Sequence, residues 1–512
     1  MRRTGKVCRL AAVVFTASVL LVGCGISSNG EPTVQDSENA ELTIGMVSDA
    51  QSLDPPNFVL AGDFVRTSLV YEGLVSLSSD GEVQPALATS WEQVSDTEWE
   101  FQLREGVTFH DGTPFNSEAV RISLERAAEQ GQASTFLGMI EKVETPDEYT
   151  ARIVLSEPNS SILNNLTVPV AGIISPRALE TKGEDIQFEA VGTGPYTFVE
   201  WEPNTSMVFE RNEDYWGAPA ALKRVTFVPI PEAGTRYSAL QSGEVDVIEN
   251  PPPSELASIE ASEELYSIIE PKARSVFLGF NLEEIPDVEV RRAIAYAIDS
   301  EAIVENVLEG VGRPATTSLT PPEYVSGNDP VGLGHDPDKA RRLLEEAGVE
   351  DLELELVLPT ERYLKDQEIA EVIQDQLAEI GVTVRLNVQE PGTWFQSLLD
   401  HETQLYWLGW GLSSGDPAEM LRRVFHSEEL NNMSQYDNEE VDELLDRLRE
   451  LEVGSAQRNQ VIQQIEQIVV EDDVVVVPVY QMSNFYAARS GVQGVHTTPT
   501  ELIDLSEVTV AE

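Results

Sequence analysis

The sequence EWEFQLREGVTFHDGTPF, at residues 98–115, says most about the fold of this 512-residue chain. In residues 98–104 apolar and polar side chains alternate, which is the period of a β-strand with one buried face. Asp111 and Gly112 then form a pair that favours a tight turn. We therefore predict a strand followed by a structural turn, and we assign His110 to that turn rather than to a catalytic triad.

Strand and helix patterns are mixed on both sides of this stretch. Residues 152–155 and 207–210 also alternate like half-buried strands, and the apolar run at 474–480 predicts a strand buried on both faces. Helical patterns occupy residues 289–303, 336–348, 367–380 and 439–469. The fold is therefore of the α/β class, and the length predicts about three domains.

The N-terminus has the features of a bacterial lipoprotein signal. Basic residues precede an apolar stretch at residues 10–22, which is shorter than the ~20 residues that a membrane-spanning helix needs. The stretch ends in Leu-Val-Gly-Cys24, which resembles a lipobox, where the thiol is acylated and the chain is cut before the cysteine. We expect residues 1–23 to be a signal peptide and residues 24–40 to be the lipidated cysteine and a flexible tether. Cys8 leaves with the signal, so no disulfide is expected.

The composition excludes several classes of function. A formal net charge of −56 leaves no basic patch for nucleic acid. No two of the five histidines have the spacing of metal ligands, and no common catalytic or phosphate-binding motif occurs. The absence of these motifs does not exclude an enzyme, but it leaves no activity to propose, and we expect a protein that is not an enzyme and that uses no metal or other cofactor. The acidity predicts adaptation to high external salt, which screens repulsion between carboxylates.

Short motifs recur along the whole chain. They lie at residues 53–55, 71–74, 85–91, 99–104, 106–115, 192–196, 212–217, 239–246, 281, 290–293, 297–299, 336–348, 409–411 and 416–417. In content and order they resemble the family 5 extracellular solute-binding proteins, which include periplasmic oligopeptide-, dipeptide- and nickel-binding proteins. Residues 106–115 are the most specific match. The resemblance implies a two-lobed, type II periplasmic-binding-protein-like fold with an extra inserted domain and a cleft between the lobes.

The resemblance also implies the domain boundaries. Lobe I would be discontinuous, the inserted domain would interrupt it, and the strands that cross between the lobes would act as hinges. The implied boundaries are 41–78, 192–278 and 481–512 for lobe I, 79–191 for the inserted domain and 279–480 for lobe II.

The implied function is that of the solute-binding component of an ABC importer. Such a protein captures peptides or similarly sized solutes and delivers them to permease transmembrane subunits that work with ATPase subunits. We expect a monomer, anchored by lipid on Cys24 to the outer face of the cell membrane, and periplasmic if the host is Gram-negative. The main alternative is a sensory lipoprotein that presents a signal peptide or solute to a receptor. A metal-chelate or haem carrier and a secreted hydrolase are further alternatives.

Several residues are assigned to the ligand site by the resemblance. A strand at 59–61 in lobe I and a strand at 409–411 in lobe II would pair with an extended ligand. Arg362 would bind a ligand carboxylate, unless it is a solvated surface residue, and Trp394 would form a wall. The assigned residues are Val59, Leu60, Ala61, Arg362, Trp394, Gly409, Trp410, Gly411, Ser413 and Asp416.

One of these positions departs from the family. Peptide-binding relatives usually place an aspartate three residues after the tryptophan that matches Trp410, where it pairs with the α-ammonium of the ligand. This chain has Ser413 there, and a hydroxyl lacks the charge that strengthens such a bond. Asp416 is an alternative partner, although an Asp-Pro pair at this place is usually structural. The solute class therefore stays open among free peptides, blocked peptides, opines and sugars. The alternative for Trp407 and Trp410 is that they do not line the cleft and are core residues of a buried strand.

Overall fold

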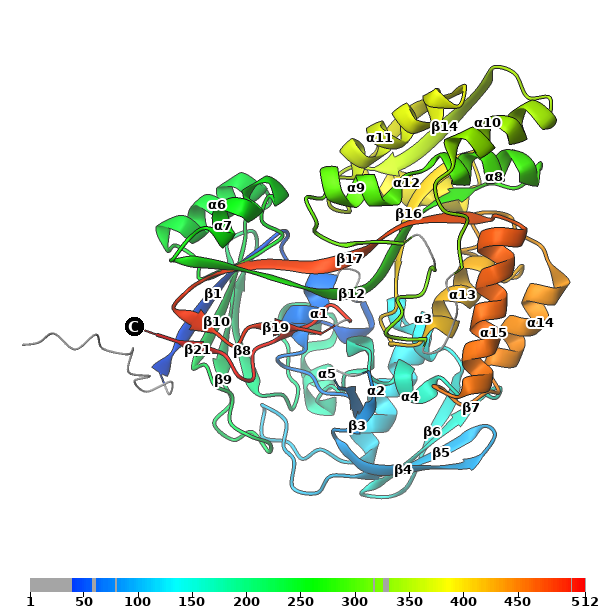
Figure 1. Cartoon of the computed structure of the whole chain (residues 1–512). Helices are drawn as coiled ribbons and strands as arrows, with labels where there is room; N and C mark the ends of the chain where they lie inside the picture. Colours follow the sequence, from blue (N-terminus) through cyan, green and yellow to red (C-terminus); the bar gives the residue numbers. More distant parts are fainter. Residues whose placement is uncertain are drawn as a thin grey trace, which may run out of the picture.

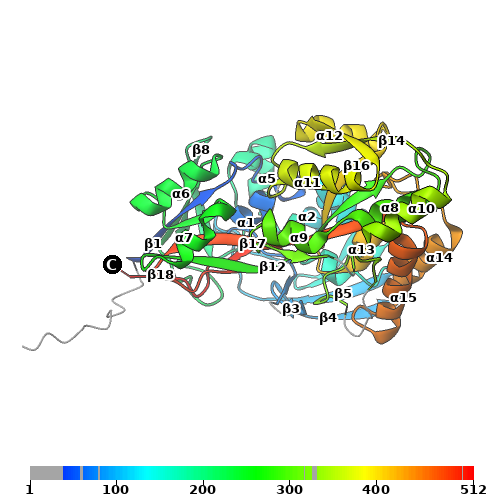
Figure 2. The same ribbon diagram turned by 45° about the horizontal axis from the view of Figure 1, so that its top comes forward.

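A single large sheet runs through the computed structural model, which describes residues 39–57, 61–78, 81–315, 318–325, 331–498 and 500–511. Its eleven strands include the path β15-β14-β16-β12-β17-β11-β1-β10-β9-β8, and β13 pairs with β17 beside this path. The two long central strands, β12 (Leu265–Phe280) and β17 (Val476–Arg489), run antiparallel and cross between two lobes (Figures 1 and 2). The predicted signal, Cys24, Val59 and Leu60 lie outside the described residues.

Lobe I contains the half of the sheet in which β1 pairs in parallel with both β10 and β11. The C-terminal tail folds back onto this lobe, and its buried residues Val492, Ile503 and Val508 join the lobe I core. The elements of this lobe are β1 (Glu41–Met46), β8 (Tyr196–Glu202), β9 (Ser206–Arg211), β10 (Arg224–Pro229), β11 (Val247–Glu249), α1 (Ala61–Thr67), α5 (Pro176–Lys182), α6 (Ala233–Ser242), α7 (Leu256–Glu260), β18 (Val492–Gln493), β19 (His496–Thr497), β20 (Ile503–Asp504) and β21 (Thr509–Val510).

Lobe II contains the other half of the sheet, in which β14 pairs in parallel with β15 and β16. Alternate residues of β16 enter two different cores: Leu405 and Trp407 enter one, Tyr406 and Leu408 the other, because side chains of a strand point to opposite faces. The elements are β13 (Arg313–Pro314), β14 (Leu352–Pro359), β15 (Val382–Gln389), β16 (Leu405–Gly411), α8 (Val288–Ala297), α9 (Ser300–Asn306), α10 (Pro337–Glu346), α11 (Asp366–Glu379), α12 (Pro391–Leu399), α13 (Pro417–Phe425), α14 (Glu439–Leu448) and α15 (Ala456–Glu466).

The inserted domain has its own four-stranded antiparallel sheet, in the order β4-β5-β7-β6. The turn predicted at His110 is present, because the Gly112 N–H donates to the Phe109 carbonyl over 2.8 Å. His110 Nε2 lies 3.0 Å from the Gly194 carbonyl oxygen, so the ring ties this turn to lobe I. The elements are β4 (Ala88–Ser95), β5 (Glu98–Leu103), β6 (Ile140–Asp147), β7 (Thr150–Leu155), α2 (Ser117–Glu129), α3 (Ser134–Leu137) and α4 (Ile162–Asn165), joined to lobe I through β2 (Val75–Leu77) and β3 (Val83–Pro85).

Most of the predicted elements are present, but four differ. The helical pattern at 439–469 is two helices, α14 and α15, with a break between Leu448 and Ala456. The single helical pattern at 289–303 is two helices, α8 and α9, because Ile298 is extended and Asp299 caps the second helix. The apolar run at 474–480 does not coincide with β17, because the strand begins at Val476 and continues past the run to Arg489. Ala61 begins helix α1, so the strand predicted at 59–61 is wrong at its last residue.

Candidate ligand-binding site

The strand register shows where the two lobes meet. Glu249, at the carboxyl end of β11, pairs with Tyr486 of β17. Trp410, near the carboxyl end of β16, pairs with Ser275 of β12, and Ser275 pairs with Gln481 of β17. β11 runs antiparallel to β17, and β16 runs parallel to it. The carboxyl ends of β11 and β16 therefore point toward each other, and they are separated by the five-residue step along β17 from Gln481 to Tyr486, about 16 Å. Ligands of α/β proteins bind outside the carboxyl ends of parallel strands, so this interval is the candidate site.

The floor of this site is an irregular stretch of β12. The pairing of β12 with β17 shifts register between Pro271 and Ser275, and such bulges redirect side chains. Both basic side chains of the stretch reach Glu501 in the C-terminal tail: Lys272 Nζ lies 3.1 Å and Arg274 Nε 2.9 Å from its carboxylate. The floor therefore carries a mostly buried cluster of two cations and one anion.

Charge pairing holds this floor cluster ionised. Burial opposes ionisation of Glu501, but Arg274 and Lys272 outweigh it and lower the pKa of the carboxyl to about 2. Arg274 Nη1 also donates to the Gly409 carbonyl over 3.1 Å. The cluster thus ties the tail of lobe I to the end of β16 in lobe II.

A side chain occupies part of the edge that was predicted to bind the ligand. The Gly409 N–H donates to the Tyr363 hydroxyl over 2.9 Å, and the same hydroxyl donates to the Gly409 carbonyl over 3.0 Å. A Cβ on Gly409 would lie 2.9 Å from the Tyr363 ring, so the close approach that requires glycine is made by this tyrosine. Gly411 presents its backbone groups on the same side, since strand residues two apart are equivalent. Among the described residues of β16, only Leu405 and Tyr406 pair with β14. The edge of Gly411 on the side of β14 therefore has no strand partner.

Arg362 projects from the loop that follows β14. Its guanidinium carbon lies 5.3 Å from the centroid of the Trp394 ring and 5.6 Å from that of Tyr363, and its Nε donates to the Tyr363 hydroxyl over 3.1 Å. Arg362 is exposed, and it forms no ion pair within the part of the chain that the structure describes. Trp394 is completely buried. It therefore supports Arg362 from below and is not itself an exposed wall.

The predicted residues that follow Gly409 lie in different environments. Trp410 is partly exposed and packs against the core that contains Tyr406, whereas Trp407 is completely buried and donates to Asp366 over 2.8 Å. Ser413 is also partly exposed, and its hydroxyl has no hydrogen-bond partner among the described residues. Trp410 and Ser413 are thus accessible, and Trp407 has the core role.

Asp416 lies apart from these accessible residues. Its side chain accepts from the Ala418 N–H at the start of α13, and its other oxygen lies 2.6 Å from Arg458 Nη2. Both charged side chains are only 1% exposed. The carboxylate of Asp416 is therefore fully occupied by structural contacts, as expected of an Asp-Pro pair at a helix start.

Asp366 is a buried residue of the site that the sequence did not identify. Burial raises the pKa of its carboxyl to about 7, although the Tyr363 N–H and Trp407 Nε1 donate to it. It fixes the backbone of the loop that carries Arg362 and Tyr363. Its contacts with the backbone of Arg362 and Tyr363 are local in the sequence. Its contact with Trp407 joins residues 41 positions apart, so the sequence does not indicate it.

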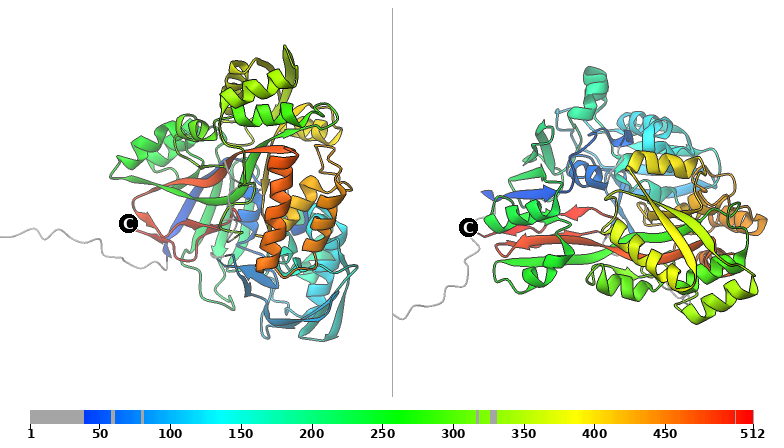
Figure 3. Two further views of the ribbon diagram at one scale, coloured as in Figure 1. Left: turned by 45° about the vertical axis from the view of Figure 1, so that its right-hand side comes forward. Right: turned by 90° about the horizontal axis from the view of Figure 1, so that it is seen from above.

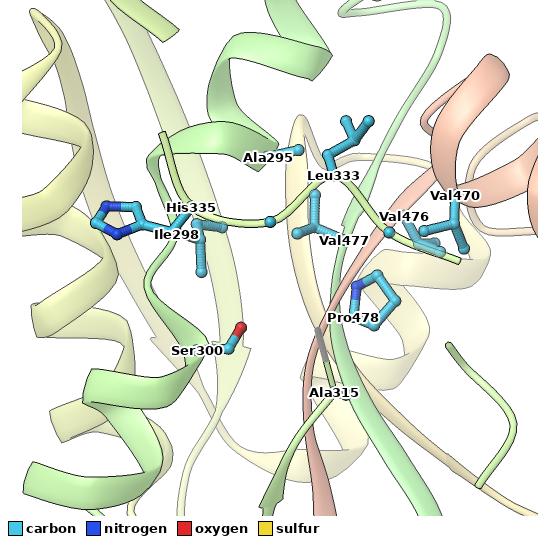
Figure 4. A pocket seen from close by; sticks show the side chains of 12 residues that line it. Ala295, Ile298, Ser300, Ala315, Leu333, His335, Val470, Val476, Val477 and Pro478 are labelled. Atoms are coloured by element: carbon cyan, nitrogen blue, oxygen red, sulfur yellow. The ribbon is translucent and has the colours of Figure 1, made fainter. Parts of the chain in front are cut away.

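A separate pocket lies in lobe II among α8, β17 and the loop before α10 (Figure 4). His335 stands at one end of its mostly apolar lining. The pocket holds about 30 Å³, far less than the roughly 300 Å³ or more of ligand pockets, so it is too small for a solute. Within the described ranges, no three His, Cys, Asp or Glu side chains are grouped as metal ligands. None of the helices described there has the length and apolar character needed to cross a membrane.

Comparison with known proteins shows extensive similarity. The model of the bacterial extracellular solute-binding proteins, family 5, matches residues 82–432. The glutathione-binding protein GsiB of Pectobacterium atrosepticum is 30% identical over 402 residues, which cover 75% of this chain and 77% of that protein.

Solved structures match over nearly the whole chain. The binding protein AgaA from A. tumefaciens R10, in complex with agropinic acid, has 27% identity and a TM-score of 0.79, with 92% of this chain and 99% of that chain covered. DppA from Helicobacter pylori, an ABC transporter-associated periplasmic binding protein in complex with the peptide STSA, has 23% identity and a TM-score of 0.80. That match covers 93% of this chain and 98% of DppA, and it supports the fold alone.

Proposed function

Because this chain belongs to the bacterial extracellular solute-binding proteins of family 5, we propose that it is the extracytoplasmic solute-binding component of an ABC importer. It captures a peptide or a similarly sized solute between its lobes and delivers it to the transmembrane subunits of a permease, which work with ATPase subunits. The fold is the two-lobed α/β fold of type II periplasmic binding proteins with an inserted domain. A role in binding a solute rather than in catalysis fits the description of this family as solute-binding proteins.

One observation carries this proposal: the carboxyl ends of parallel strands in both lobes point at the same short interval of the crossing strands. A strand edge at Gly411 is available there for an extended backbone, which is how peptides add to sheets. Arg362 stands at the same edge, and its guanidinium forms no ion pair with a described residue, although it interacts at longer range with the Asp366 carboxyl. A planar guanidinium held over an aromatic ring is well suited to bind a carboxylate.

The solute we favour therefore has a carboxylate and an amide-rich backbone. Ser413 offers a hydroxyl where relatives have the aspartate, and Asp416 is occupied elsewhere. A free α-ammonium thus finds no carboxylate at this position, and blocked peptides or opines fit as well as free peptides. The named relatives bind glutathione and agropinic acid, both compatible with this chemistry.

We also propose the domain limits and the cellular location that the sequence implies. Lobe I comprises 41–78, 192–278 and 481–512, the inserted domain 79–191 and lobe II 279–480, although helix α5 within 79–191 packs into the lobe I core. Residues 1–23 are removed as a signal peptide and Cys24 is lipidated, which anchors the protein to the outer face of the cell membrane. The protein is a monomer in this arrangement.

Thermal unfolding in the presence of chemically matched probes tests this proposal. The probes are free di- to pentapeptides, the same peptides with an amidated C-terminus, the same peptides with an acetylated N-terminus, glutathione and agropinic acid. A probe at 100 times its dissociation constant stabilises the folded state by about 2.7 kcal/mol. We expect shifts that require the free carboxylate and survive acetylation. Absence of any shift, with folded and ligand-free protein, would contradict the proposed class of solute. Uptake that depends on neighbouring permease genes separates the importer from a sensory lipoprotein.

A further inference from the structure

We propose that the contact between the inserted domain and lobe II is a polar latch that holds the lobes closed, with Arg458 at its centre. This contact lies beside the ligand-binding site and not within it. Figures 1 and 3 show helices α13 and α15 of lobe II, in orange, next to the cyan inserted domain.

The centre of the latch is a buried network of charges and hydroxyls. Arg458, on α15, donates from Nη2 to Asp416 over 2.6 Å and to the Ser161 hydroxyl over 2.9 Å. Its Nη1 donates to the Ser160 hydroxyl over 2.9 Å. Ser161 in turn donates to Asp416 over 2.5 Å. One guanidinium of lobe II thus binds two consecutive serines of the inserted domain.

Further polar contacts surround this centre. The Ser160 N–H donates to the Arg449 carbonyl over 2.8 Å, which is a backbone bond between the two domains. The Asn164 side-chain amide donates to the Ser414 carbonyl over 3.1 Å. Two more arginines of lobe II reach the inserted domain: Arg449 pairs with Glu157, and Arg423 donates to the Thr135 carbonyl. Lobe II therefore supplies the cations, and both sides supply acceptors.

The apolar cores do not cross this boundary. Among the described residues, the core of the inserted domain contains none from lobe II, and the lobe II core behind α13–α15 contains none from the inserted domain. Water can replace hydrogen bonds when two polar surfaces separate, so the net cost of opening is modest. Separating apolar surfaces would instead expose them to water. A polar boundary between two complete cores is suited to repeated opening.

The latch also holds the loop that leads away from the candidate site. Ser414 and Asp416 contact the inserted domain, and they directly follow the accessible Ser413. Between them, Gly415 has a φ of 71°, and a Cβ there would lie 3.0 Å from Leu77 Cδ2. The short loop 413–416 therefore carries both a residue of the candidate site and the residues that contact the inserted domain. Any effect of the latch on solute affinity rests on the proposed function, whereas the latch itself does not.

Two variants of the ligand-free protein test the latch. Ser160→Trp places a large ring at the boundary while leaving both cores intact, and Arg458→Met removes the central guanidinium. The control is Arg447→Met, which removes an exposed arginine that forms no ion pair with a described residue. Small-angle X-ray scattering measures the radius of gyration, and hydrogen exchange followed by mass spectrometry measures protection of the segment that contains the Ser160 amide.

We expect both latch variants to have a larger radius of gyration and at least about tenfold faster exchange at Ser160, with unchanged protection in β5 and β7. The control should match the unmodified protein. The proposal is overturned if both variants retain the original radius and exchange rate. It is equally overturned if protection in β5 and β7 falls together with that at Ser160, because the inserted domain would then be unfolding rather than separating.

Discussion

Replacing Glu501 by glutamine tests the floor cluster most directly. The carboxylate lies within about 3 Å of both Lys272 and Arg274, and its side chain is 11% exposed. Its pKa is about 2 in the folded protein and 4.5 as the ordinary value, so the charged form is favoured by folding. This difference corresponds to about 3 kcal/mol of folding stability at neutral pH, and glutamine has no charge with which to provide it.

The pH dependence of this effect has a definite sign. A carboxyl with a lowered pKa contributes its full stability above its unfolded pKa, and the contribution is lost as the pH falls toward the folded pKa. The difference in unfolding free energy between the original protein and Glu501→Gln should therefore be about 3 kcal/mol at pH 7 and roughly 1 kcal/mol at pH 3.

Urea unfolding followed by tryptophan fluorescence measures this difference. Glu507→Gln is the matched control, since Glu507 lies on the same tail but is exposed. It should change stability by less than about 0.5 kcal/mol. A loss below about 1 kcal/mol for Glu501→Gln at pH 7, or a loss that stays constant down to pH 3, would refute the assigned charge pairing.

Four other perturbations have defined outcomes. Burial raises the pKa of Asp366 to about 7 from 3.8, so its contribution to stability falls as the pH rises between these values. Asp366→Asn should flatten the profile of unfolding free energy in that window, and an unchanged slope would contradict the assignment. Arg362→Gln should weaken binding of a carboxylate-bearing probe by about 10- to 100-fold but leave its amidated form unaffected, as calorimetry can show. Equal losses for both forms would assign Arg362 a structural role. Cys24→Ala should abolish labelling by radioactive palmitate and release the protein from the membrane fraction, whereas retained labelling would exclude Cys24 as the anchor. Raising the salt concentration should increase the melting temperature, because 89 acidic residues face only 33 basic ones. Full stability in dilute buffer would contradict the salt hypothesis.

Local patterns made much of the fold predictable. The alternation at residues 98–104 is strand β5, and Asp336 caps helix α10 as its sequence indicates. These features depend on neighbours within a few residues, which the sequence displays directly. The family resemblance predicted the two-lobed fold, and the comparisons confirm both family and fold.

The length of the crossing strand β17 could not be predicted from its local sequence pattern. The apolar run of β17 ends at Tyr480, yet the strand continues through Gln481 to Asn484, which lie where the lobes meet. Polar residues at this position look like a strand end in the sequence. Pairing with β12, and at Gln481 also with β13, keeps them extended, because the partner strands supply backbone hydrogen bonds.

Local patterns and the family resemblance were enough to assign the family, the class of fold and the positions of Arg362, Trp410 and Ser413 near the ends of lobe II strands. The tertiary structure decided which polar groups remain available there. It placed Tyr363 on Gly409 and buried Trp394 beneath Arg362.

The pairing of charged residues was likewise decided by the tertiary structure. Glu501 is 227 residues from Arg274, and Ser161 is 297 residues from Arg458. In a chain with 89 carboxylates, sequence gives no means of choosing which one meets which arginine. That choice is made by packing, because only folding excludes water from a pair of charges and makes their interaction specific.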